Sequence, residues 1–154
     1  MTNDTNRLLV FTIQGIKYAL SLRDIAEVLE PPPIYPIPYV PHYFPGIINF
    51  HGKLMPVLDL AGFFNNAQRN LHGHVLALND GVANLALWVD TIDNIGRSDV
   101  IGEKYESDET FVEKVLKMAG GEVKMLSAEK LLDKLEEILS AISPQPLTGK
   151  RNVQ

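Results

Sequence analysis

Eight of the ten prolines in this 154-residue chain fall between Pro31 and Pro56, and this cluster limits the fold more than any other feature of the sequence. Proline has no backbone N–H and a nearly fixed φ, so residues 31–45, PPPIYPIPYVPHYFP, cannot form a helix or a central strand. Apolar residues along it, such as Ile34 and Ile37, favour an extended loop packed over a core. The alternative is a proline-rich ligand for another domain.

Short strands with turn signals precede this loop. The apolar run LLVFTI at 8–13 and the alternating KYALSL at 17–22 are separated by Gln14 and Gly15, which predicts a hairpin. Residues 23–30, RDIAEVLE, fit either one helical turn or a bent strand, and periodicity over so few residues does not decide between them.

More strands are predicted after the loop. IINF at 47–50 and LMPVLDL at 54–60 flank a short His-Gly-Lys turn. Residues 61–73 indicate a polar connection. HVLALND at 74–80 and NLALWVDTI at 84–92 predict a second strand pair around an Asp-Gly turn.

The last third of the chain contains the clearest helix. NIGRSDVI at 94–101 predicts a short strand and 102–110 is polar, whereas 111–126, FVEKVLKMAGGEVKML, fits a helix or two strands joined at the glycines. Ser127 is a plausible N-cap for a helix that ends before Pro144. The apolar stripe of this helix consists of Leu131, Leu132, Leu135, Ile138 and Leu139. Many short strands and one helix predict one or two small β-barrels.

Composition excludes several classes of function. The net charge of −5 does not suggest a nucleic-acid-binding protein, which needs a basic face. The chain has no cysteine, so disulfides, thiolate metal sites and cysteine nucleophiles are excluded. The sequence has neither a signal peptide nor an apolar run of roughly 20 residues, so we expect a cytoplasmic protein without membrane insertion.

No constellation of residues in the sequence indicates catalysis. There is no G-x-S-x-G, P-loop or G-x-G-x-x-G motif. Asp90 and Asp93 are expected at a strand end facing water, and Asp59 is expected to accept backbone amide hydrogen bonds. His72 and His74 lack a third ligand at metal-binding spacing. We therefore expect a protein that is not an enzyme and holds neither a metal nor a cofactor.

The order of the motifs resembles the CheW-like family, the adaptor domain of bacterial chemosensory signalling. It runs VFTIQGIKYALSL, IAEVL, a proline-rich loop ending PYVPHYFPGIINFHG, KLMPVLDL and LALWVDTIDNI. The block GIINFHGKLMPVLDL at 46–60 is its most specific part. We expect a CheW-like domain over 7–140, with flexible termini at 1–6 and 143–154.

The resemblance implies a mainly β fold, in which two SH3-like five-stranded β-barrel subdomains pack together beside a C-terminal helix. This favours strands over a helix at 111–126. It also implies a non-enzymatic adaptor that couples the cytoplasmic tips of methyl-accepting chemoreceptors, docked in an apolar groove between the subdomains, to a CheA-type histidine kinase. We expect the regulatory domain of the kinase to contact Ile47, Ile48 and Phe50. The alternative is a stand-alone CheW-like interaction domain in another pathway, such as surface motility or second-messenger signalling.

Site residues follow from the family motifs. Ile25 and Glu27 occupy the receptor-contacting V-x-E motif, Asn49 and Gly52 match N-(apolar)-R-G, and 89–92 match V-D-x-(apolar) near the groove. The complete set of expected partner-binding residues is Ile25, Glu27, Ile47, Ile48, Asn49, Phe50, His51, Gly52, Lys53, Val89, Asp90 and Ile92.

His51 departs from the family motif, which usually has arginine at this position. Arginine is always charged and binds a carboxylate through two parallel hydrogen bonds, whereas histidine is shorter and only partly charged near neutral pH. The change should weaken a charge pair with Glu27 or with an acidic residue of the receptor. We interpret the chain as a divergent adaptor, with a merely tolerated turn residue at this position as the alternative.

Overall fold

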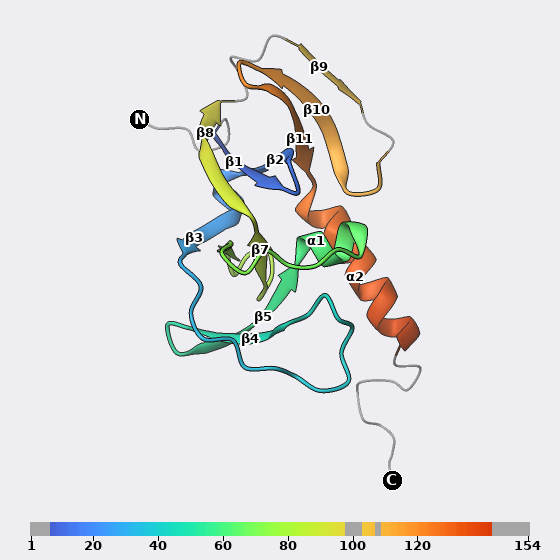
Figure 1. Cartoon of the computed structure of the whole chain (residues 1–154). Coiled ribbons are helices and arrows are strands. Elements are labelled where there is room, and N and C mark those ends of the chain that lie inside the picture. Colours follow the sequence, from blue (N-terminus) through green and yellow to red (C-terminus); the bar gives the residue numbers. More distant parts are fainter. Residues whose placement is uncertain (1–6, 98–102, 107–108, 143–154) are drawn as a thin grey trace.

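A computed structural model describes residues 7–97, 103–106 and 109–142. The described chain forms two β-sheets and two α-helices, with one sheet above the other in the view of Figure 1 and both helices on the right. The flexible termini expected at 1–6 and 143–154 lie outside the described residues, as does the second half of the strand expected at 94–101.

The first sheet has six strands in the order β8-β1-β2-β11-β10-β9. These strands are β1 (Arg7–Ile13), β2 (Ile16–Ser21), β8 (Thr91–Arg97), β9 (Glu103–Glu106), β10 (Val112–Met118) and β11 (Gly121–Leu126). Neighbouring strands are antiparallel except β2 and β11, which run parallel. The parallel pair joins a hairpin from the start of the chain to one from near its end.

The second sheet has five strands in the order β3-β6-β7-β5-β4. These strands are β3 (Ile25–Leu29), β4 (Gly46–Phe50), β5 (Lys53–Asp59), β6 (His74–Leu78) and β7 (Ala86–Val89). A single 3-10 turn, η2 (Leu22–Asp24), leads from the first sheet into the second. The helices are α1 (Leu60–Asn65) and α2 (Ala128–Ile142), and α2 runs down beside both sheets (Figure 1).

One apolar core is shared by both sheets and α2. Phe11 of β1, Leu58 of β5, Leu87 of β7 and Leu131 of α2 all belong to it. Leu8 and Val10 point to the other face of β1, into a smaller core within the first sheet. Burial of both faces explains why β1 is a continuous apolar run rather than an alternating one. Since the two sheets share a core, they should unfold together.

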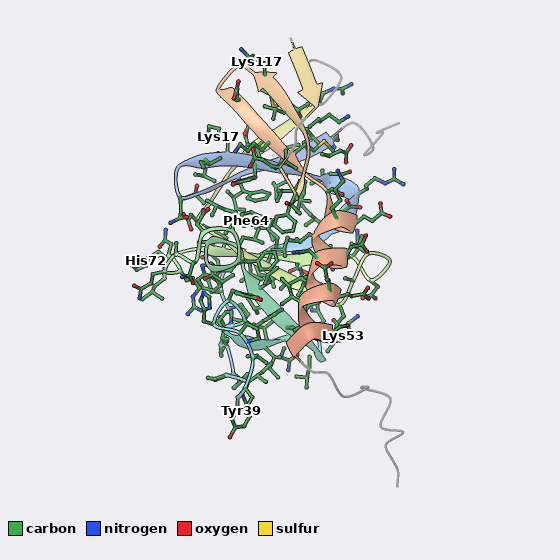
Figure 2. All side chains as sticks on the ribbon, turned by 90° about the vertical axis from the view of Figure 1, so that its right-hand side faces the viewer. Lys17, Tyr39, Lys53, Phe64, His72 and Lys117 are labelled. Atoms are coloured by element: carbon green, nitrogen blue, oxygen red, sulfur yellow. The ribbon has the colours of Figure 1, made fainter. Side chains whose placement is uncertain are left out.

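The proline-rich segment is the predicted extended loop. The N–H and C=O of Tyr35 each bond to Ile47 at 2.9 Å, so the loop covers part of the edge of β4. Gly46 is required beneath it, because a Cβ there would lie 2.3 Å from the carbonyl oxygen of Tyr35. Tyr39 at the tip of the loop is fully exposed and points away from the molecule (Figure 2).

The expected fold class is confirmed as mainly β, with two sheets and a C-terminal helix. One sheet has six strands instead of five, and the described pairings leave β8, β9, β3 and β4 as edges rather than closing either sheet into a barrel. The additional strand is β9, which lies in the polar stretch 102–110. An edge strand needs only backbone pairing on one side, so a charged sequence, EKYE, can form it.

The structure decides the remaining ambiguities. Residues 23–30 begin with η2 and continue as a strand, and 111–126 form two strands rather than a helix. Ser127 caps α2 as predicted, because its Oγ accepts a hydrogen bond from the N–H of Lys130 at 3.2 Å. The prediction of a plain connection at 61–73 was wrong at its start, where α1 packs Leu60 and Ala61 into the shared core.

Candidate partner-binding surface

The turn between β4 and β5 has a defined conformation. His51 and Gly52 both have positive φ, at 53° and 86°, as the two central residues of a type I′ hairpin turn do. The side-chain oxygen of Asn49 accepts a hydrogen bond from the N–H of Gly52 at 2.7 Å. The turn therefore holds His51 at the end of the hairpin in a fixed position.

His51 pairs with Glu27 within the chain. Its Nε2 lies 2.8 Å from Oε1 of Glu27, and the ring of Phe50 packs against the imidazole with centroids 4.5 Å apart. The His51 side chain is 70% exposed and that of Glu27 is 43% exposed. The interaction brings an edge strand, β3, close to the turn that follows the opposite edge strand, β4. Of the two acidic partners considered from the sequence, Glu27 is the one that the structure provides.

An ion pair extends this surface. The ammonium group of Lys53 bonds to the carboxylate of Asp80 in the turn between β6 and β7. Sequence reasoning used Asp80 only as a turn residue, although an acid in an Asp-Gly turn is also an exposed charge. We call the group Glu27, Asn49, Phe50, His51, Gly52, Lys53 and Asp80 the hairpin-turn surface.

Ile48 and Val89 do not belong to any surface. Both side chains have 0% exposure, which is incompatible with direct contact to a partner in this structure. Ile48 lies on the inner face of β4 because side chains alternate along a strand. Val89 lies on β7, whose two faces contribute to two different apolar cores. Ile47, by contrast, is half-buried at the bridge to the proline-rich loop.

Asp90 and Ile92 lie at the junction of β7 and β8, where their contacts are to β1 and its turn. The carboxylate of Asp90 accepts a hydrogen bond from the N–H of Gln14 at 2.7 Å, and Ile92 packs against the shared core. Asp93 binds Thr12 and Lys17, each at 2.8 Å. These bonds outweigh the opposing effect of burial and lower the pKa of Asp93. The two acids therefore have structural partners rather than simply facing water.

Asp59 is buried at the start of α1, with 4% exposure. Burial raises the pKa of its carboxyl group, whereas the N–H of Gly62 and the charge of Arg69 oppose the increase. Its side chain makes no regular capping hydrogen bond to the helix, and Oδ1 has no partner among the described residues. The predicted amide acceptor is thus only weakly satisfied.

A cleft of about 600 Å³ lies between η2, the β6–β7 turn and the start of α2. Asp24, Glu113 and Glu129 line it together with apolar residues, and none of the expected partner-binding residues does. Burial raises the pKa of Asp24, and Arg23 opposes the increase. This cleft is more polar than the apolar groove implied by the family resemblance.

The described residues contain no group of three or more His, Cys, Asp or Glu side chains that could hold a metal ion. His74 instead faces Glu30, with Nε2 and Oε2 3.3 Å apart. No helix in the described part of the chain is long and apolar enough to cross a membrane.

Three comparisons place this fold among known proteins. The family model described as the CheW-like domain matches residues 7–136. The chemotaxis protein CheW of Rhizobium meliloti (strain 1021) is 26% identical over 61 residues, which are 40% of this chain and 39% of that protein. The match thus spans about two fifths of that relative's length.

A solved structure is similar over most of the chain. The scaffolding protein TtCheW from Thermoanaerobacter tengcongensis superposes with a TM-score of 0.69 at 25% identity, covering 80% of this chain and 89% of that one. The two sheets and C-terminal helix described above are therefore the CheW-like arrangement. The chain belongs to the CheW-like domain family, a family of scaffolding domains that are not enzymes.

Proposed function

We propose that this chain is a non-enzymatic adaptor that couples chemoreceptors to a CheA-type histidine kinase. The observation that carries the proposal is the exposed His51–Glu27 pair. The family resemblance implies that Glu27 contacts the receptor, and we assign His51 to the same contact. Membership of the CheW-like family supports it. In this role the protein works in the cytoplasm, beside membrane-anchored receptor arrays.

The two partners are assigned to neighbouring parts of the surface. The receptor tip contacts Ile25, Glu27 and His51, and the regulatory domain of the kinase contacts Ile47 and Phe50. Asn49, Gly52 and Lys53 shape and charge the turn between these areas, whereas Asp90 and Ile92 support the β7–β8 junction. Ile48 and Val89 act from beneath, since their side chains are buried. Apolar contacts would supply most of the binding energy, and charges the specificity.

Pairing inside the chain changes how a receptor would meet His51. In the free protein the imidazole already has a carboxylate partner at 2.8 Å. An acidic residue of the receptor must compete with Glu27 for it, while a basic residue of the receptor could add to Glu27. We therefore expect a receptor that presents a basic rather than an acidic residue to this pair.

The first experiment is a titration of the full chain against the regulatory domain of a CheA from the same genome, followed by calorimetry and NMR. We expect a dissociation constant on the order of micromolar and chemical-shift changes at 46–53. Lys134→Ala, on the exposed face of α2, is the matched control and should leave the affinity unchanged. Absence of binding to every such kinase domain would overturn the proposal.

The second candidate is a CheW-like interaction domain that serves another pathway. The histidine in place of the motif arginine favours it, because an internally paired imidazole is a poor substitute for a free guanidinium. Replacing His51 with arginine distinguishes the two. A changed affinity for a receptor or kinase supports the coupling role, whereas no binding by either form favours the other pathway. Equal binding by both forms would show that His51 is only a turn residue.

A further inference from the structure

Aromatic side chains line a cavity at the junction of the two sheets. The cavity has a volume of about 330 Å³, and its rings are Tyr18 of β2, Phe64 of α1 and Phe111, which directly precedes β10. The centroids of Tyr18 and Phe64 are 5.5 Å apart, and Phe64 and Phe111 stack at 5.5 Å with an angle of 20°. Phe64 and Phe111 remain partly exposed, so the cavity presents aromatic surface to solvent.

One negative charge lines this cavity, and a positive charge that does not line it is paired with that residue. Glu109 lines it, and its carboxylate lies 2.7 Å from the ammonium group of Lys124. Lys124 is paired across the strands with Tyr18, which places the ion pair beside the rings. The hydrogen bond to Glu109 raises the pKa of Lys124, so the ammonium group stays charged. Thr110 and Asn65 add neutral polar groups to the lining.

We propose that this cavity binds a small zwitterion with one planar ring, of the class of the aromatic α-amino acids. The ring packs against Phe64 and Phe111, where offset or edge-to-face contacts between aromatic groups are favourable. The ligand's ammonium group bonds to Glu109 and its carboxylate to Lys124, giving two charge-assisted hydrogen bonds. The cavity is at the lower end of the size range of small-molecule sites, so the ligand must be small.

The charge pattern selects this class over simpler aromatic compounds. A ligand with only one charge would satisfy one member of the Glu109–Lys124 pair and repel the other. An uncharged ring would lose both charge-assisted bonds. A molecule that carries both charges next to its ring complements Glu109 in the cavity lining and Lys124 beside it.

This site is separate from the hairpin-turn surface. Figure 1 shows α1 and α2 on the right and β3 on the left. The proposal therefore does not depend on the coupling function. The cavity is built by α1, which follows the second sheet, and by strands of the first. A bound ligand would touch both halves of the fold and stabilise it.

The test is an NMR titration of the full chain with L-phenylalanine. We expect saturable shifts of the amides of Phe64, Thr110, Phe111 and Leu126, with a dissociation constant on the order of 1 mM. Phenethylamine and 3-phenylpropanoate each lack one charge, and L-cyclohexylalanine lacks the aromatic ring. Each should bind at least about fivefold more weakly. Absence of saturable shifts at these amides, at any soluble concentration of L-phenylalanine, would overturn the proposal.

Glu109→Gln tests the assigned role of the carboxylate. It removes the acceptor charge from an exposed side chain and should weaken L-phenylalanine binding about tenfold. Binding of 3-phenylpropanoate, which has no ammonium group, should not weaken. Glu137→Gln is the matched control, since it breaks another exposed ion pair, with Lys134, outside the cavity. Equal binding by the two variants would contradict the assignment.

Discussion

The β4–β5 hairpin is buried on the inner face of its strands and exposed at its turn, although both parts belong to the same family motif. Ile48, Met55 and Val57 have no exposed surface, whereas the His51 side chain is 70% exposed. The strand residues pack into the core of the second sheet, and the turn residue meets Glu27 at the surface. The residues of a motif that identify a family can therefore be core residues as well as surface residues.

Truncation of a buried side chain of this hairpin should reduce stability more than any other change considered below. Ile48→Ala removes a fully buried side chain and should lower the free energy of unfolding by about 2–5 kcal/mol, through lost apolar burial and the cavity left behind. Chemical denaturation with far-UV circular dichroism measures it.

Leu54→Ala, on the same hairpin but 61% exposed, is the control. It should cost less than about 1 kcal/mol, because an exposed side chain leaves no cavity. Similar losses for both variants would mean that the inner and outer faces of the hairpin are wrongly assigned.

Replacing either of two glycines of the hairpin with alanine should reduce stability, but for different physical reasons. Gly46→Ala places a Cβ 2.3 Å from the carbonyl of Tyr35 and should cost about 1–3 kcal/mol through overpacking. Gly52 has open space around it but a φ of 86°, so Gly52→Ala should cost about 1 kcal/mol through backbone strain.

Asparagine substitutions distinguish overpacking from backbone strain, since asparagine tolerates positive φ better than alanine does. Gly52→Asn should recover most of the stability lost in Gly52→Ala. Gly46→Asn should recover none, because the clash with Tyr35 remains. Recovery at both positions in urea denaturation would argue against a steric limit at Gly46.

The sequence predicted elements that are long enough to show a pattern and missed elements that need none. Patterns of several residues predicted most of the strands, the proline-rich loop and α2 with its cap at Ser127. They left 23–30 and 111–126 open between helix and strand, and only the family resemblance favoured strands at 111–126. The short α1 was missed because six residues are too few for a helical period to appear. β9 was missed because an edge strand has no required apolar pattern.

The predicted site residues include side chains that the structure places on opposite faces of one strand. Ile47 and Ile48 are neighbours in sequence, yet alternation along β4 turns only one of them inward. Val89 was included because it matches the first position of the V-D-x-(apolar) motif, but all of β7 is buried. The pairing of His51 with Glu27 could be anticipated from the motif, whereas Lys53 with Asp80 depends on how two turns meet in space.

The pH dependence of stability should change less, through two carboxylates: Asp59 at the end of β5 and Asp93 in β8. The pKa of Asp59 is raised above its ordinary value of 3.8 by burial, so the folded state binds this proton more tightly than the unfolded state. Its contribution to stability therefore grows as the pH falls through the folded-state pKa towards 3.8, and is lost as the pH rises. Asp59→Asn should remove this gain in denaturation curves measured across that range.

Asp93 provides the opposite sign. Its pKa is lowered below 3.8 by hydrogen bonds from Lys17 and Thr12, against the effect of burial. Its contribution is complete above 3.8 and is lost as the pH falls through the folded-state pKa. Asp93→Asn should therefore flatten the loss of stability in acid. If the two variants changed the pH dependence in the same direction, the environments assigned to the two acids would be wrong.

The smallest effect on stability should come from the most exposed contact, the His51–Glu27 pair. A double-mutant cycle with His51→Ala and Glu27→Ala should give a coupling energy of about 0.2–1 kcal/mol in unfolding, as exposed ion pairs do. The same cycle measured for binding to a receptor tip should give a larger coupling, because a partner excludes water from the pair. A large coupling in unfolding with none in binding would mean that His51 serves the turn alone. A small coupling in unfolding with a large one in binding would show that position 51 is not constrained by core packing as Ile48 is. Histidine could then replace the motif arginine there without loss of the fold.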